Sequence, residues 1–200
     1  MYNKLVIGID QSYKNTGISL CADNDLKKVG SVYLENLKSN SEKRLMLRER
    51  LDKIIRLNIN KANEVQIIIE RIRLSSQGFI NIDYIKSIGA LNSIIVDTAR
   101  EYNLKVYSVD TRSWKSNVVG TSKEQKNSLG VDPKKWPTIL YVESLGFHNS
   151  IIREVSARKV KGVFIEDGKR YIYNDDAADS ACIALYGFLP KSIQLLKEEH

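Results

Sequence analysis

The 200-residue sequence has few of the residues that build zinc sites or disulfide frameworks: two cysteines, two histidines and three prolines. Cys21 and Cys182 have no metal-ligand spacing, so we expect both to be small, buried, apolar side chains. His148 and His200 are too few and too far apart for a zinc site. These absences exclude a zinc-finger protein and a disulfide-stapled domain.

Long apolar runs are also absent. No run reaches the roughly 18 residues that span a bilayer, and the start, MYNKLVIGID, lacks the small-residue cleavage site of a secretory signal. We therefore expect a cytosolic protein without a membrane partner. The 42% of hydrophobic residues is enough for one sizeable core, which predicts a single domain over residues 1–200.

Positive charge is the first informative excess. Lys and Arg number 31 against 24 Asp and Glu, which gives a net charge of +7. This excess favours a polyanionic partner, either nucleic acid or a membrane surface, although many ordinary proteins share it.

The N-terminal third has the pattern of strands. KLVIGID, at residues 4–10, is a nearly continuous apolar run that ends in an acid, as in strands buried on both faces. TGISLCA at 16–22 and KKVGSVYLEN at 27–36 predict two further strands, and their short links indicate a meander.

Helical and strand patterns then alternate. Residues 39–61 have apolar positions at helical spacing, with Ser41 as a candidate N-cap, and residues 79–103 repeat that spacing. EVQIIIERI at 64–72 and LKVYSVD at 104–110 predict buried strands. The order predicts an α/β fold in which helices cover a mixed sheet.

The C-terminal half is more polar. A basic stretch at 111–137 precedes predicted helices near Thr138 to Ser144 and after Asp176, and VFIEDGKRYIY predicts a hairpin turning at Asp167 and Gly168. The basic residues before that hairpin, at 151–162, fit a helix or a loop.

Acidic residues end two of the apolar strands, Asp10 the first and Glu70 the strand at 64–72. Either alone has even odds of being a solvated strand end. Asp176 and Asp179 are three apart and share one face of the helix that begins there, among alanines. A helix cap explains one aspartate of NDDAADSA, and Asp175 or Asn174 can provide it.

Four carboxylates brought together require a compensating cation. Mg²⁺ and Mn²⁺ prefer oxygen ligands, and no histidine or cysteine accompanies these acids. The set therefore predicts a two-ion site for phosphodiester chemistry, surrounded by a basic surface that holds nucleic acid.

The chain resembles the RuvC-type Holliday junction resolvases at four landmarks, found in the family's order from Gly8 to Gly187. These are GIDQSYKNTGIS, IIIERI, RSWKSNVVGTSKEQK and DDAADSACIALYG. The third carries the family's Arg, Lys, Val-Val-Gly and second Lys at Arg112, Lys115, 118–120 and Lys126. The resemblance implies a ribonuclease H-like fold with a five-stranded mixed sheet flanked by helices.

The resemblance also implies roles for single residues. The four metal-binding carboxylates fall on Asp10, Glu70, Asp176 and Asp179, which hold two Mg²⁺ or Mn²⁺ ions, and the DNA-contacting catalytic lysines fall on Lys115 and Lys126. Arg73, Arg112 and Lys123 are further candidate DNA contacts. The implied protein is a homodimer that nicks opposing strands of branched DNA such as four-way junctions. Without the resemblance, the lysines fit solvated loop charge better.

Three features depart from the family pattern. Gln11-Ser12 replaces the usual Pro-Gly after the first aspartate, and Arg73 stands where cellular members have an aromatic residue. The stretch Phe147 to Tyr173 is longer than in bacterial members. Such compact, divergent versions look most like those of bacteriophages, which would place the protein in a bacterial cytoplasm.

Other classes of protein share part of the pattern. Actin-like ATPases and sugar kinases also begin with Gly-Ile-Asp, but they need a second similar domain, for which this chain has no room. A nuclease-dead DNA-binding module leaves the carboxylates unexplained. A general ribonuclease H or a structure-tolerant branched-DNA nuclease remains an alternative. Dimerisation is predicted through Ile85 to Ala99, where Gly89 and Ala90 allow helices to approach closely.

Overall fold

A mixed β-sheet forms the centre of the structure, a computed structural model that describes residues 1–71, 82–121, 123–156, 162–192 and 194–199. Over these ranges the sheet has seven strands in the order β10-β6-β5-β1-β2-β3, with β4 also paired to β2. Strands β1, β5 and β6 are parallel, and β2 and β10 are antiparallel to their neighbours. The strands are β1 (Tyr2–Asp10), β2 (Asn15–Ala22), β3 (Asp25–Lys28), β4 (Ser31–Tyr33), β5 (Ala62–Glu70), β6 (Lys105–Val109) and β10 (Lys197–Glu199).

The predicted α/β class, a mixed sheet flanked by helices, is confirmed. The path β3-β2-β1-β5-β6 supplies the five expected strands, and β4 and β10 make the sheet larger than predicted. The single strand predicted at 27–36 is wrong, because the chain forms two shorter strands there, and β3 and β4 pair with different parts of β2.

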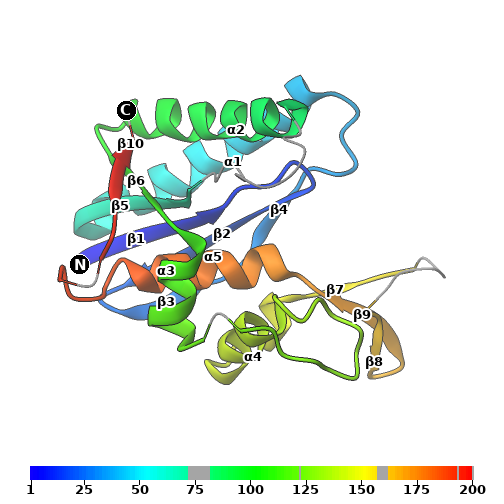
Figure 1. The fold of residues 1–200 in the computed structure, drawn as a ribbon. Coiled ribbons are helices and arrows are strands. Elements are labelled where there is room, and N and C mark those ends of the chain that lie inside the picture. Colours follow the sequence, from blue (N-terminus) through cyan, green and yellow to red (C-terminus); the bar gives the residue numbers. More distant parts are fainter. Residues whose placement is uncertain (72–81, 122, 157–161, 193, 200) are drawn as a thin grey trace.

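Helices cover both faces of the sheet (Figure 1). One face packs against α1 (Asn40–Asn58) and α2 (Ile82–Arg100), and the other packs against α5 (Asp175–Tyr186), which is accompanied by α3 (Thr111–Trp114) and α4 (Trp136–Ser144). No helix among the described residues is long and apolar enough to cross a membrane.

The strands divide their apolar residues between the two faces. Ile7 and Ile9 of β1 join the core under α1 and α2, whereas Val6 joins the core under α5. In β5, Ile67 and Ile69 lie in the first core and Ile68 lies in the second. This alternation explains the continuous apolar runs, because each strand is buried on both sides.

Helix α1 begins two residues earlier than expected. Its N-cap is Ser39, not Ser41: the Ser39 hydroxyl accepts from the Glu42 amide, and the Glu42 carboxylate accepts from the Ser39 amide. This reciprocal pair satisfies two amides that would otherwise lack partners, which Ser41 inside the helix does not do.

The basic stretch after β6 is helical at its start. Asp110 caps α3 by accepting from the Arg112 amide, and a π-helical turn, η2 (Lys115–Val119), continues it to Gly120. Gly120 has a φ of 81°, which suits glycine and ends the turn.

A second, smaller sheet lies beside α4. It contains β7 (Ile152–Glu154), β9 (Lys169–Tyr173) and β8 (Phe164–Glu166) in that order, all antiparallel. The predicted hairpin at Asp167 and Gly168 is confirmed, and both residues have positive φ as a tight turn requires. Residues 151–156 open with a strand instead of the helix or loop expected, and 157–161 lie outside the described residues.

Candidate functional site

Asp10 and Glu70 end neighbouring parallel strands on the same side of the sheet. Ile9 of β1 lies opposite Ile69 of β5, and each acid is the next residue along its strand. Because successive side chains alternate, Asp10 and Glu70 share the face of Val6 and Ile68, which is the face that α5 covers.

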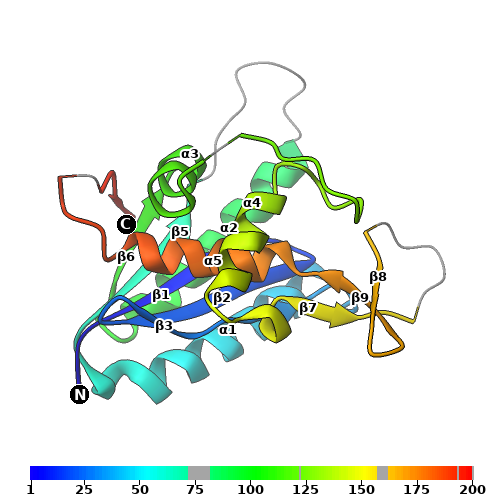
Figure 2. The same ribbon diagram turned by 90° about the horizontal axis from the view of Figure 1, so that it is seen from below.

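Helix α5 approaches this face very closely, and two glycines make the approach possible. A Cβ on Gly17 would lie 1.9 Å from the Asp176 carbonyl oxygen, and a Cβ on Gly8 would lie 2.3 Å from the Ser180 carbonyl oxygen. Gly17 is also the β2 residue opposite Asp10. The first turn of α5 therefore rests on the strand end that carries Asp10, as Figure 2 shows for the helix as a whole.

The N-cap of α5 is Asn174, one of the two residues that the sequence allowed. Its side-chain oxygen accepts from the Ala177 amide, and its side-chain nitrogen donates to Ser31 Oγ at 2.8 Å. The cap thus joins the helix start to β4. Asp175 is then left outside both the cap and the predicted metal pair.

Asp176 lies beside Asn15, which begins β2. Asn15 Nδ2 donates to Asp176 Oδ2 at 3.0 Å and to Asn174 Oδ1 at 2.6 Å. Burial, followed by repulsion from Asp175, raises the pKa of Asp176 to about 7. A carboxyl group with this pKa takes up or loses a proton near neutral pH.

Asp179 is the most enclosed of the four carboxylates, with 3% of its side chain exposed. Lys135, at the start of α4, places its Nζ 3.0 Å from Asp179 Oδ2 and 3.1 Å from Asp175 Oδ2. Burial alone would lower the pKa of Lys135, but the negative charges of Asp179, Asp10 and Asp175 outweigh burial and raise it far above its usual value. Lys135 is therefore a cation fixed among the carboxylates.

Glu70 is held by donors from the segment after β6. The Thr111 hydroxyl donates to Glu70 Oε1 at 2.6 Å, and Trp114 Nε1 donates to Oε2 at 3.3 Å. Gln11 reaches across from β1 and donates to the Glu70 backbone oxygen at 2.5 Å. The departure from Pro-Gly at Gln11 thus ties the ends of β1 and β5 together.

The four carboxylates influence one another electrostatically. Burial, and then the negative charges of Asp179 and Glu70, raise the pKa of Asp10 well above its ordinary value. Burial also raises the pKa of Glu70, against the opposing hydrogen bond from Thr111. Asp10, Glu70, Asp176 and Asp179 therefore form one patch of mutually repelling acids.

This patch has the chemistry of a site for a hard divalent ion, since all its ligand atoms are oxygens. Asp179 Oδ1 is buried and has no hydrogen-bond partner. As the side chains lie, no group of three or more His, Cys, Asp or Glu in the described ranges has the geometry of a metal site. Both carboxylate oxygens of Glu70, and one oxygen each of Asp176 and Asp179, are instead engaged by protein donors.

The predicted basic residues fall into two groups. Lys115 is half-buried beside the site: its Nζ lies 5.1 Å from the centre of the Trp114 ring and donates to the Lys134 carbonyl at 3.2 Å. Arg112, Lys123 and Lys126 are exposed. Arg73 lies outside the described residues, so its role stays a prediction, as does that of the exposed three.

Several residues of the site have no counterpart in the sequence prediction. Asn15, Thr111, Trp114 and Lys135 all contact the carboxylates, and none stands out by local pattern. Gly17 carries a usable signal, because a glycine inside a strand often marks close approach of another backbone.

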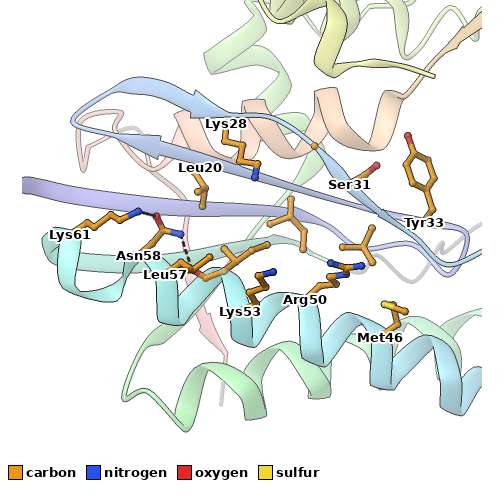
Figure 3. Close-up of a pocket in the computed structure, with 14 residues that line it drawn as sticks. Leu20, Lys28, Ser31, Tyr33, Met46, Arg50, Lys53, Leu57, Asn58 and Lys61 are labelled. Carbon is orange, nitrogen blue, oxygen red and sulfur yellow. Dashed lines mark hydrogen bonds between the residues drawn. The ribbon is translucent and has the colours of Figure 1, made fainter. Parts of the chain in front are cut away.

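A hollow lies on the face of the sheet opposite to the four carboxylates. It has a volume of about 680 Å³ and is formed by β2, β3, β4 and α1. In Figure 3, Lys28 points from the strands toward α1, and Arg50 and Lys53 belong to α1. We call it the basic groove; its charged lining residues are Lys28, Arg50, Lys53 and Lys61.

Two solved structures resemble this fold, a ribonuclease H-like mixed sheet flanked by helices. Thermus thermophilus RuvC in complex with a Holliday junction substrate has a TM-score of 0.58 at 14% identity, over 90% of this chain and 90% of that chain. A second Thermus thermophilus RuvC structure has a TM-score of 0.55 at 14% identity, over 92% of this chain and 95% of that chain. No protein-family model and no curated protein matches the sequence.

Proposed function

We propose that the protein is a metal-dependent endonuclease that nicks branched DNA, with four-way junctions as its substrate. The observation that carries the proposal is the meeting of Asp10, Glu70, Asp176 and Asp179 on one face of a RuvC-type fold. The similar RuvC structure is a complex with a Holliday junction. The net charge of +7 suits a DNA partner.

In this proposal the four carboxylates hold two Mg²⁺ or Mn²⁺ ions. The bound ions would supply activation of a water, which displaces the 3′-oxygen in line and leaves a 5′-phosphate. Thr111, Trp114 and Asn15 orient the carboxylates through their hydrogen bonds. Lys115 neutralises charge on the scissile phosphate, and Lys126, Lys123, Arg112 and Arg73 contact the DNA strands.

The protein acts as a single-domain homodimer in this proposal, so that two sites nick opposing strands. The half-buried Gly89 of α2 supports it, because a side chain added there meets no atom within 4 Å. Light scattering at micromolar concentration tests the dimer, and a persistent monomer would contradict paired nicking.

A cleavage panel tests the activity. Four-way, three-way, fork and flap DNA are incubated with Mg²⁺ beside plain duplex and RNA–DNA hybrid. Symmetric nicks across the four-way junction are expected. Equal cutting of all branched forms would favour the alternative, a structure-tolerant nuclease, and cutting of the hybrid alone would favour a ribonuclease H.

The assignment of the acids has its own test. Asp10→Asn and Glu70→Gln should slow junction cleavage on the order of a thousandfold while leaving junction binding intact, because phosphate contacts come from basic residues. Junction cleavage at the wild-type rate by either variant would refute the assignment.

A further inference from the structure

Lys135 provides the positive charge that Asp179 contacts in the structure. Its ammonium donates to Asp179 Oδ2 at 3.0 Å, whereas Asp179 Oδ1 is buried without a partner. The Asp179 side chain is only 3% exposed, so water screens this carboxylate poorly. Removal of the ammonium would leave a buried, uncompensated negative charge next to other acids.

The same oxygens are the ligands that a divalent ion needs under the proposed function. An ammonium and a divalent ion that share one carboxylate oxygen would repel each other strongly at such short range. Lys135 at its observed position and a metal ion on the same carboxylate therefore oppose each other, whether the ion binds Oδ2 or the unpartnered Oδ1.

We propose that Lys135 is an internal counterion that occupies the carboxylate site in the metal-free protein and is displaced from Asp179 when a divalent ion binds. This inference rests on the proposed function only in taking Asp179 as a metal ligand. Lys135 thereby sets how tightly the site binds metal, and it keeps the carboxylates in place when no metal is present.

The structure provides a place for the displaced ammonium. A hollow of about 360 Å³ adjoins Lys135 and is lined by Asp132 and Asp175, among others. Asp175 already accepts a contact from Lys135 at 3.1 Å, and its side chain is 40% exposed. Lys135 can thus leave Asp179, keep Asp175 as a partner and reach solvent. This gives Asp175 a function that neither the helix cap nor the metal pair supplied.

Manganese binding tests the proposal without DNA or turnover. Free Mn²⁺ is measured by electron paramagnetic resonance during titration of the wild type, Lys135→Met and Lys134→Met. Lys134 is the matched control, because it is exposed and pairs at 3.6 Å with Glu124 in the loop before α4. We expect Lys135→Met to bind Mn²⁺ at least about tenfold more tightly than the wild type, and Lys134→Met to match the wild type.

Thermal melting of the same proteins gives a second readout. In EDTA, Lys135→Met should melt several degrees below the wild type, and saturating Mn²⁺ should close that gap, because the metal replaces the missing charge. Unchanged or weaker Mn²⁺ binding by Lys135→Met would overturn the proposal.

A measurement on the wild type covers the case in which Lys135→Met fails to fold. Reductive methylation of lysines is followed by mass spectrometry with and without Mn²⁺. Lys135 should react about tenfold faster in Mn²⁺, whereas Lys134 should react equally in both. An equal methylation rate of Lys135 with and without bound Mn²⁺ would overturn the proposal.

The outcomes separate this inference from the proposed function. Tighter Mn²⁺ binding by Lys135→Met in a protein that cuts no DNA would support the counterion and refute the nuclease. Mg²⁺-dependent junction cleavage by the wild type, together with equal Mn²⁺ affinity of the wild type and Lys135→Met, would support the nuclease and refute the counterion.

Discussion

The two faces of the sheet carry charges of opposite sign, and water screens the charges on one face far more than those on the other. The carboxylate patch under α5 is enclosed, and Lys135 lies within it at 3.0 Å from Asp179. In the basic groove under α1, Lys28, Arg50 and Lys53 form no ion pair with any described residue. Like charges are tolerated in the groove because water and salt screen them, whereas buried like charges require a counterion.

The comparison teaches where charge in this protein is coupled to structure. A change in the carboxylate patch should alter stability and, under the proposed function, metal binding, because Asp179 is buried and Glu70, Asp176 and Asp179 are hydrogen-bonded. A change in the basic groove should alter neither by much. The following predictions test this contrast, beginning with the largest expected effect.

Gly17→Ala should destabilise the protein by about 3 kcal/mol. The added Cβ would lie 1.9 Å from the Asp176 carbonyl, so α5 must move off the sheet. Urea unfolding measures the loss. Gly30→Ala is the control, because a Cβ there meets no atom within 4 Å. Similar stability of the two variants would disprove the close contact.

Thr111→Val should cost about 2 kcal/mol, because it removes a donor from the largely enclosed Glu70 carboxyl group. Thr111→Ser keeps the hydroxyl and should recover most of the loss in chemical denaturation. If valine and serine behave alike, the hydrogen bond does not hold Glu70.

The pH dependence of stability in EDTA follows from Asp176. Its pKa of about 7 in the folded protein exceeds the ordinary value of 3.8, so between these values the folded state binds a proton that the unfolded state releases. Asp176 therefore makes stability fall as pH rises from about 4 to about 7, by at most about 1.4 kcal/mol per pH unit.

Asp176→Asn should remove that slope. Urea denaturation at pH 5, 6, 7 and 8 measures the difference between wild type and variant, which should stop growing above pH 7. An identical slope in both proteins would place the titrating group elsewhere. Under the proposed function, divalent metal should reverse the trend in the wild type, because ligand carboxylates must lose their protons.

Lys53→Ala should change stability by less than about 0.5 kcal/mol, the smallest effect in this series. Lys53 lines the basic groove and pairs with no acid in the described parts of the chain. Thermal melting at low and high salt is the measurement. A loss as large as that of Thr111→Val would mean that the two faces do not differ as described.

The sequence predicted the parts of the site that depend on local pattern. Asp10 and Glu70 end apolar strands, and the alternation of side chains within each strand places both on one face. The helical spacing of Asp176 and Asp179 likewise predicted that both lie on one face of a helix. The choice of Asp176 over Asp175 came from the family pattern, and the contact of Asp175 with Lys135 agrees with a separate role.

The remainder of the site depends on contacts between distant segments. Lys134 and Lys135 are adjacent and chemically identical in the sequence, yet one is exposed and the other reaches Asp179, 44 residues further along the chain. Local spacing carries no information about such a pair. Ser39 and Ser41 differ for a related reason, because Glu42 lies three residues after Ser39 and completes the reciprocal cap.

The alternation of side chains along β1 makes the position of Asp10 depend on the register between β1 and β5. A slip of one residue between β1 and β5 would turn Asp10 to the face that α1 and α2 cover. Asp10 would then be buried in the apolar core that contains Ile7 and Ile9 in the correct register. A misaligned molecule would then lack its first carboxylate even if it were compact. Under the proposed function, the rate of junction cleavage per mole of protein would therefore report the fraction of molecules whose strands are in register.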